Sequence, residues 1–330
     1  METQAPGRPS SSKLNKMSKI ELAKRDKRFH EGAIKRVLNH FLVGVLIAVS
    51  WLPFWILYRL SDALFIVLRF IIKYRFKVIT ENLKFAFPEK TEKEISEIRN
   101  KFYRHICDVF FESIKLYSIS DKEMEKRMVI TGAEIANDFF DKGRSVIALA
   151  MHHNNWEWTC FAQSKLKHHI LNIYNPIRGN NAMEKFLLHN RQKWGSKSIP
   201  VHKTVRAVID YNLKGMLTGL WLAADQTPPA TSKFWTIFLN REAPFFQGPE
   251  KIAASTNQPV FFQHTKKIGR GKYSIEFSVL FENPKEVEQK EILLAYVRKA
   301  EEIIRQEPEY YLWSHRRWKH KRPDGIPLTV

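Results

Sequence analysis

The chain is poor in the residues that mark several common classes of protein. It has two cysteines among its 330 residues, Cys107 and Cys160, and they lie too far apart to form a metal-ligand spacing. Reduced thiols in a cytosolic setting are therefore expected. Its 13 glycines form no glycine-rich nucleotide loop, and the sequence has no internal repeat. These absences argue against a disulfide-rich secreted domain, a cysteine-based metal module and a repeat protein.

What the chain has in excess is positive charge. It contains 54 Lys and Arg against 34 Asp and Glu, a formal net charge of +20. This excess indicates an anionic partner, which could be nucleic acid, an anionic membrane, a phosphorylated lipid or an acidic carrier protein. A hydrophobic content of 44% is enough for a proper core. The length allows one large domain, or a core domain with an appendage.

The N-terminal quarter has its own composition. Residues 1–12 have the proline, glycine and serine content of a disordered tip, and the basic stretch 13–36 can form a helix. Phe41–Tyr58 is a run of 18 residues without a charge, at the lower limit of the ~17–25 residues needed to span a bilayer. Trp51 and Trp55 lie near its end, as interfacial anchors do. No small-residue cleavage site follows, which argues against a secretory signal.

Positive charge flanks this apolar run on both sides, so the positive-inside rule gives no clear orientation. A helical hairpin in one leaflet, with both ends cytoplasmic, explains the pattern better than a clean crossing. The alternative is a buried pair of apolar helices within the globular domain.

Beyond residue 80, short apolar runs alternate with helical patterns. Strands are expected at 145–151, 170–175, 217–223, 259–265 and 273–281. Helices are expected at 92–117, 155–167, 181–194, 202–213, 248–257 and 286–306. The alternation predicts an α/β fold with a mostly parallel sheet covered by helices. The chain then divides into a basic, partly disordered N-terminal segment (1–35), membrane-associated hydrophobic helices (36–80) and the main domain (81–330).

The most informative stretch is Met151–Glu157, directly after the apolar run 144–150. We expect the run to be a buried strand and the residues after it to begin a helix. Histidine and a carboxylate then meet at the edge of an open α/β sheet, where ligands bind. A neutral imidazole that takes a proton from an alcohol, held by a carboxylate, suits this position.

Two pairings are possible within this stretch. His153 and Glu157 are four apart and would share a face of one helix. His152 could reach Glu157 only from a loop before the helix. The structural alternative is that the histidines satisfy a core, with Asn154 or Asn155 as the helix N-cap.

Further polar side chains follow other strands. Arg178 lies on the loop after the second expected strand, where it could grip a phosphate ahead of a helix, and Arg191 lies in that helix. Either arginine could instead pair with a carboxylate at the edge of the core. Asp225 ends the third strand at the same edge, where it could hold a loop or bind substrate. The C-terminal run Tyr310–Pro323 interleaves basic residues with tryptophan, which suits nucleic acid or a membrane interface.

Taken together, these runs resemble the lipid A biosynthesis acyltransferase family, the late (lauroyl/myristoyl-type) acyltransferases of bacterial outer-membrane lipid. The matches follow the family order from about residue 40 to 322 and are specific as a set. They are the His-x4-Glu box at His152–Glu157, a Tyr-Arg-Pro-like loop at Tyr174–Arg178, an Arg-x3-Gly step at Arg191–Gly195, an Asp-Gln turn at Asp225–Gln226, the glycine of Gly248–Pro249 and the C-terminal signature at Leu312–Lys319. The chain departs from the family where His153 and Asn154 stand in place of a frequent Phe-Gly, and where Asn175 replaces a common arginine.

The resemblance implies a glycerolipid-acyltransferase-like fold and an enzyme attached to the cell inner membrane, with its active site facing the cytoplasm. It implies transfer of a fatty acyl chain from acyl carrier protein to a hydroxyl of a lipid A-type phosphorylated glycolipid. It selects His152 as the general base and Glu157 as the group that orients it. Arg178 and Arg191 would then bind the acceptor phosphate or support the pocket, and Asp225 would bind substrate.

No cofactor or metal is needed for this reaction, because a thioester is already activated, and no nucleic acid is expected as a partner. Two alternatives stay open. One keeps the chemistry and changes the acceptor to another glycolipid or an aminolipid. The other is a membrane-tethered binding protein without catalysis.

Overall fold

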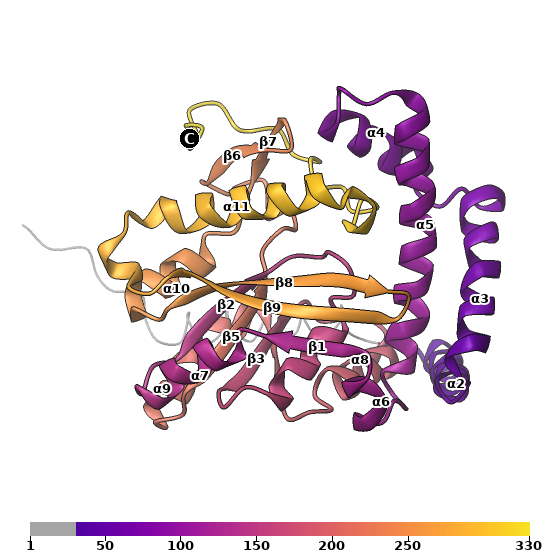
Figure 1. Cartoon of the computed structure of the whole chain (residues 1–330), viewed down its shortest axis with the longest axis horizontal. Helices are drawn as coiled ribbons and strands as arrows, with labels where there is room; N and C mark the ends of the chain where they lie inside the picture. The colour runs from indigo at the N-terminus through magenta and orange to yellow at the C-terminus, as the bar shows by residue number, and fades with distance from the viewer. Residues whose placement is uncertain (1–30) are drawn as a thin grey trace, which may run out of the picture.

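A computed structural model of the chain describes residues 31–330. Its centre is a seven-stranded sheet of order β1-β9-β8-β2-β5-β3-β4, with helices on both faces (Figure 1). The strands of this sheet are β1 (Met128–Thr131), β2 (Val146–Ala150), β3 (His169–Tyr174), β4 (Lys197–Pro200), β5 (Thr218–Ala223), β8 (Val260–Gly269) and β9 (Lys272–Phe281). A separate two-stranded sheet pairs β6 (Trp235–Phe238) with β7 (Arg241–Pro244).

The central sheet is mostly parallel, which confirms the predicted fold class. β8, β2, β5, β3 and β4 run in one direction, β9 is antiparallel to β8, and β1 pairs in parallel with β9. All five strands expected from the sequence are present as β2, β3, β5, β8 and β9. The four strands that the sequence did not indicate have only four residues each, too few to show an alternating pattern.

The described part of the chain also forms α-helices and several short helices of other types. The α-helices are α2 (Ala33–Ser50), α3 (Phe54–Ile66), α4 (Phe76–Ala86), α5 (Glu92–Lys115), α6 (Asp121–Glu125), α7 (Ala133–Asp141), α8 (Asn181–Arg191), α9 (Thr204–Leu213), α10 (Gly248–Thr256) and α11 (Gln289–Gln306). Short helices of other types are the π-helix η1 (Val67–Ile71) and the 3-10 helices η2 (Trp158–Ser164), η3 (Val201–Lys203), η4 (Pro284–Glu286) and η5 (Pro308–Tyr310). α5 begins with a capping box, in which Thr91 and Glu94 bond each other's backbone N–H.

The charge-free run Phe41–Tyr58 is not one helix. α2 ends at Ser50 and α3 begins at Phe54, because Pro53 suits a helix start and not its interior. In the described part of the chain, one helix is long and apolar enough to cross a membrane, and it is Ala33–Ser50. The expected disordered tip and most of the expected basic helix lie outside the described residues.

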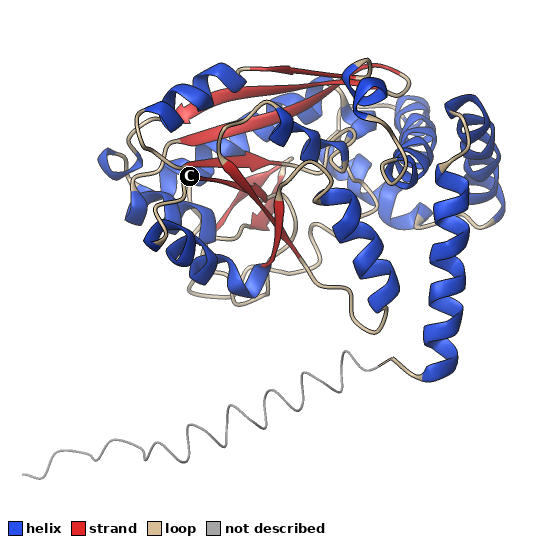
Figure 2. Cartoon of the chain, turned by 90° about the horizontal axis from the view of Figure 1, so that it is seen from below, coloured by secondary structure: helices blue, strands red, loops and turns tan. Residues whose placement is uncertain are grey.

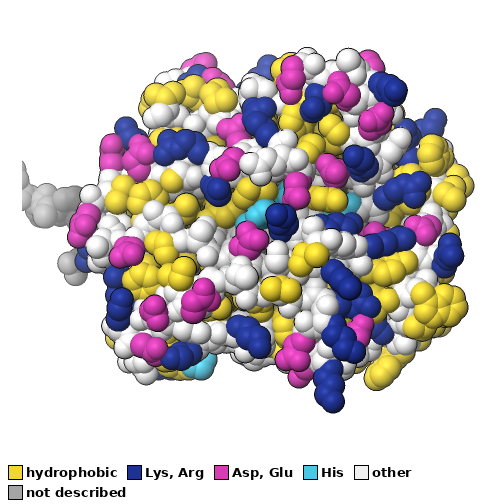
Figure 3. Space-filling model, in the orientation of Figure 1, with side chains coloured by type: hydrophobic (Ala, Val, Ile, Leu, Met, Phe, Trp, Pro, Cys, Tyr) yellow, Lys and Arg dark blue, Asp and Glu magenta, His cyan; other side chains and the backbone are white. Residues whose placement is uncertain are grey.

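The second apolar helix, α3, packs on α5 and so belongs to the body of the protein. Its buried face carries Leu57, Ser61 and Phe65, and the Ser61 hydroxyl donates to Asp108 Oδ1 at 2.7 Å. The opposite face is exposed. Figure 3 shows hydrophobic side chains along the edge of the molecule where α2 and α3 lie. The domain boundaries at residues 35 and 80 stay predictions.

One buried carboxylate joins several of these elements. Glu112 of α5 accepts hydrogen bonds from Tyr58 of α3 at 3.0 Å, from Tyr273 of β9 at 2.8 Å and from Asn155 at 2.7 Å. Burial raises the pKa of Glu112. Because Asn155 belongs to the histidine box, this network fixes the box against α5.

Candidate active site

Two neighbouring parallel strands end beside each other at the candidate site. β2 leads into His152 and β5 leads into Asp225, and Ala150 of β2 pairs with Ala223 of β5. The His152 Nδ1 atom lies 2.7 Å from Asp225 Oδ1, and the His152 backbone N–H donates to Asp225 Oδ2 at 3.0 Å. Both carboxylate oxygens of Asp225 thus hold the same histidine.

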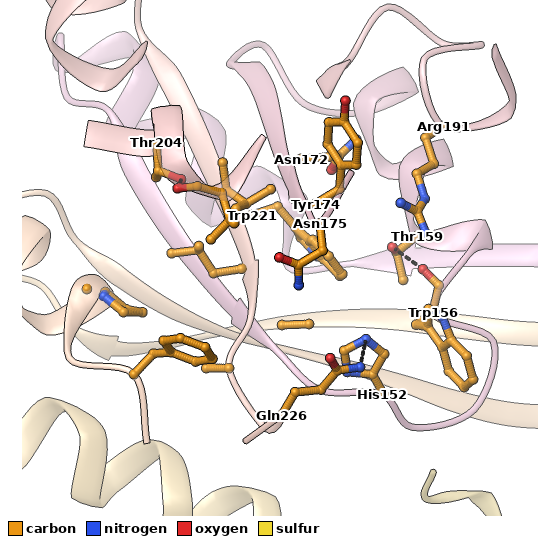
Figure 4. A pocket seen from close by; sticks show the side chains of 18 of the residues that line it. His152, Trp156, Thr159, Asn172, Tyr174, Asn175, Arg191, Thr204, Trp221 and Gln226 are labelled. Carbon is orange, nitrogen blue, oxygen red and sulfur yellow. Dashed lines mark hydrogen bonds between the residues drawn. The ribbon is translucent and has the colours of Figure 1, made fainter. Parts of the chain in front are cut away.

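This contact fixes which nitrogen of His152 is free. Burial alone would raise the pKa of Asp225, but its interaction with His152 lowers it below the usual value, so the carboxylate is ionised. An ionised carboxylate only accepts hydrogen bonds, so Nδ1 carries the proton and Nε2 has the lone pair. The Gln226 amide donates to that lone pair at 3.1 Å (Figure 4). The Nε2 atom of His152 therefore faces the side-chain amide of Gln226.

The structure pairs Glu157 with Arg191 and not with His152, contrary to the contact expected within the histidine box. Its two oxygens accept hydrogen bonds from Arg191, at 2.6 and 2.9 Å, while the carboxylate bonded to His152 is that of Asp225. Burial would raise the pKa of Glu157, but Arg191 lowers it, so the pair is ionic. Asp225 contacts His152, and its role as a substrate-binding residue stays a prediction. Arg191 supports the wall of the cavity.

The residues after β2 do not form the expected first turn of a helix. Asn154 has a φ of +56°, a left-handed conformation that interrupts any helix and that Asn tolerates better than most residues. Glycine suits the same conformation, which explains why Asn154 can stand where the family often has glycine. The predicted helix 155–167 is instead the 3-10 helix η2, and the Asn155 side chain accepts from the Trp158 N–H at 3.1 Å near its start.

His153 faces away from His152, into the core. Its Nε2 lies 3.1 Å from the Glu307 carbonyl and its Nδ1 lies 3.0 Å from the Asn154 amide, so both nitrogens are in use. Burial lowers the pKa of His153 to about 4, which keeps the ring neutral. Atoms of His153, His264 and Glu307 come within 4.8 Å of one another. The two hydrogen bonds of His153 give it a structural role within this group.

A cavity of about 400 Å³ opens beside His152. Gln226 and His152 lie together at one end of the view in Figure 4, and Arg191 and Tyr174 lie at another. Apolar side chains form much of its wall: Ile173, Val201, Val205, Trp221, Leu222, Phe246 and Ile252. Such a wall suits a hydrocarbon chain. Arg178 is not among the residues that line the cavity; it lies in an exposed turn between β3 and α8.

The C-terminal signature is part of the core behind the histidine. The Leu312 N–H donates to the His152 carbonyl at 3.1 Å, and the Asn154 N–H donates to the Tyr310 carbonyl at 3.0 Å. Trp313 is fully buried. The aromatic side chains of this run therefore support the loop that carries His152, and the buried ones cannot stack on bases.

Sequence reasoning missed two residues that contact His152. The Trp156 ring lies edge-on to the imidazole, with 5.4 Å between the ring centroids, and Gln226 bonds Nε2. The Asp225-Gln226 pair did carry a signal, because it follows an expected strand. What the sequence could not indicate is that β5 lies directly beside β2.

A buried acid near the cavity gives a prediction on pH. Glu250 lies in the first turn of α10, and burial raises its pKa from the ordinary 4.5 to about 7. The folded state then binds a proton that the unfolded state releases, so this group reduces stability as pH rises from about 4.5 to 7. We expect Glu250→Gln, which mimics the protonated acid, to have a higher Tm than wild type at pH 8 and a similar Tm at pH 4.5. Thermal unfolding across this range checks it, and equal pH dependence of the two proteins would contradict it.

Comparison with known proteins gives a family match. A sequence model described as bacterial lipid A biosynthesis acyltransferase matches residues 24–320. The chain is 27% identical over 294 residues to the lipid A biosynthesis lauroyltransferase of Escherichia coli strain K12, covering 86% of this chain and 92% of that protein. It is 23% identical over 238 residues to the lipid A biosynthesis acyltransferase of Haemophilus influenzae, covering 70% and 72%.

Among solved structures, the chain is similar to the 1-acyl-sn-glycerophosphate acyltransferase PlsC from Thermotoga maritima. The two are 14% identical, the similarity covers 83% of this chain and 98% of the other, and the TM-score is 0.35, too low to support an argument on fold. The family match, by contrast, spans the whole sheet and the cavity. The chain therefore belongs to the bacterial lipid A biosynthesis acyltransferase family and is an acyltransferase.

Proposed function

We propose that this acyltransferase takes its acyl chain from acyl carrier protein and transfers it to a hydroxyl of a lipid A-type phosphorylated glycolipid, with His152 as general base. The observation that carries the mechanism is the contact between His152 Nδ1 and the buried Asp225 carboxylate, which leaves Nε2 beside the cavity. A histidine in this tautomer can accept a proton from an alcohol.

The reaction needs no covalent intermediate on the enzyme. The acceptor hydroxyl takes the place of the Gln226 amide at His152 Nε2 and gives up its proton to that nitrogen. The oxygen attacks the thioester carbonyl carbon, the carbon–sulfur bond breaks, and the leaving thiolate receives the proton from the imidazolium. The ionised Asp225 stabilises the imidazolium between these two proton transfers. Glu157 and Arg191 hold the opposite wall of the cavity in place.

Charge and hydrophobic exposure support the choice of donor and of location. The net charge of +20 favours encounter with an acidic carrier protein and with anionic lipid. α2 exposes Ile34, Val37 and Phe41, which fits attachment to the inner membrane. Both cysteines are free and buried, which fits a reducing compartment and a site that faces the cytoplasm.

A donor competition tests the proposal. Purified full-length protein in mild detergent is given a lipid A precursor and a radiolabelled acyl chain, carried either by acyl carrier protein or by coenzyme A. We expect label in one lipid and a higher kcat/KM with the carrier protein, with the advantage falling as salt screens the charges. Equal kcat/KM for the two donors at low salt would remove the carrier protein from the proposal. Label in another glycolipid or in an aminolipid alone would change the acceptor.

A further inference from the structure

A second apolar surface lies on α9, far along the chain from the N-terminal helices. Val201, Val205, Ile209 and Leu213 are exposed to 44%, 60%, 52% and 81%. They follow one another at steps of four residues, so they lie along one side of η3 and α9. An adjacent side of α9 is anchored, because Val208 is buried in the core and Thr204 is buried at the helix start. We call these four side chains the α9 stripe.

The α9 stripe begins in the wall of the catalytic cavity. Val201 and Val205 line the cavity that holds His152, and Ile209 and Leu213 continue the stripe outward. An apolar path therefore leads from the reaction site to the protein surface. A lipid chain could follow this path without crossing water.

The surroundings of the α9 stripe are basic. Exposed His202, Lys203, Arg206 and Lys214 lie on η3, on α9 or directly after it. α9 has one acidic residue, Asp210. Its Oδ2 atom lies 3.7 Å from Nε of Arg206, so the positive charge of that arginine balances its negative charge. An apolar strip bordered by cations is complementary to an anionic lipid surface, which offers both hydrocarbon and phosphate.

The first apolar helix lies at another border of the same cavity. α2 packs against α8, and its Lys35 lies beside Gly179 in the loop that precedes α8. This loop begins at Asn175, which also lines the cavity. In Figure 2, α2 follows the grey trace and extends beyond the body of the molecule. The cavity thus has exposed apolar residues on α2 and on α9 near its rim.

We propose that the α9 stripe is a second membrane-docking element, which rests on the surface of a bilayer that contains anionic lipid and places the cavity mouth against that surface. The proposal rests on the proposed function, since it assigns to this stripe the task of keeping the mouth at the source of the lipid acceptor. α2 provides attachment, and α9 sets the orientation of the attached enzyme.

A site-specific fluorophore tests the docking directly. The native cysteines are buried, so an environment-sensitive dye can be placed selectively on Ile209→Cys in the full-length protein. A matched label goes on Ile135→Cys, at a side chain of α7 with 39% exposure. With phosphatidylglycerol vesicles we expect a blue shift and quenching by lipid-borne quenchers at position 209, and neither at position 135. No shift at 209 while a dye on Phe41→Cys of α2 does shift would overturn the proposal.

The same label at position 209 also distinguishes a membrane from the two other partners that could cover the α9 stripe, a protein and a second copy of the chain. A shift at 209 that requires acyl carrier protein and no lipid would overturn membrane docking in favour of a protein partner. A shift that depends on protein concentration alone would point to a second copy of the chain and equally overturn it. If the dye at position 209 enters the bilayer but the protein transfers no acyl chain, membrane docking is supported and the proposed function fails. Failure of the docking proposal can therefore be told apart from failure of the proposed function.

Activity gives an independent test. Ile209→Ser with Leu213→Ser removes the outer half of the stripe and leaves the cavity wall unchanged. We expect transfer to an acceptor in vesicles to fall about tenfold, because the enzyme loses apolar anchorage, while transfer in detergent micelles stays at the wild-type rate. Ile135→Ser with Ile237→Ser, at positions exposed to 39% and 42%, is the control and should lose neither activity. Equal losses of the two variants in vesicles would contradict the proposal.

Discussion

His152→Ala should reduce kcat by about 10²–10⁴, the range found when a general base is removed. The loss follows from the geometry, since Nε2 of His152 faces the cavity and is directed by the buried Asp225. KM should change little, because the imidazole deprotonates the acceptor and contributes little to holding its lipid chains. Single-turnover transfer of a labelled acyl chain from acyl carrier protein measures the effect.

Removal of His152 also affects the stability of the fold, and the experiment must distinguish this effect from the loss of catalysis. The substitution leaves Asp225 Oδ1 without the imidazole, while the backbone N–H of residue 152 still donates to Oδ2, and a buried charge that loses a partner destabilises a fold. His152→Gln is a useful companion, because its amide can donate a hydrogen bond to Asp225 but is not a base. Both variants should lose activity to a similar extent, with a smaller loss of Tm for the glutamine. Near-normal turnover in either folded variant would refute the role of His152 as base.

Much of the fold could be predicted because its central strands are long apolar runs. β2, β3, β5, β8 and β9 were all expected from sequence, since each has at least five residues of buried or alternating pattern. The N-terminal region was harder to interpret. The run Phe41–Tyr58 is uniformly apolar, and only Pro53 marks the place where one exposed helix ends and a helix packed on α5 begins.

The candidate site shows where sequence reasoning fails. His152 was selected by the family resemblance, and it does lie at a strand end beside the cavity. Its carboxylate partner was sought within the box, as if spacing along the chain set the distance. The partner is Asp225, 73 residues away in sequence, and it is close because β5 pairs with β2. No spacing rule gives the order of strands in a sheet, so Glu157 was the nearer choice in sequence and the wrong one for this bond.

Asp225→Asn should then have the second large effect, a fall in kcat of about 10²–10⁴. The asparagine has nearly the same volume, but its amide can present an N–H to the ring where the carboxylate presented an acceptor. His152 then shifts toward the tautomer with the proton on Nε2, and the base is lost from the side that faces the cavity. The imidazolium also loses the negative charge that stabilises it during the reaction. Steady-state kinetics of the folded variant measure the loss.

A comparison with Glu157→Gln shows whether Asp225 acts on His152 or on the fold. Glu157 is paired with Arg191 and not with His152, so its glutamine variant should lower Tm, because it leaves the arginine without its counter-charge, and reduce kcat by less than about tenfold. Asp225→Asn should reduce kcat far more than Glu157→Gln does, because only Asp225 is bonded to the imidazole. If instead Glu157→Gln reduced kcat by about 10²–10⁴ and Asp225→Asn did not, the carboxylate of the histidine box would be the functional partner after all.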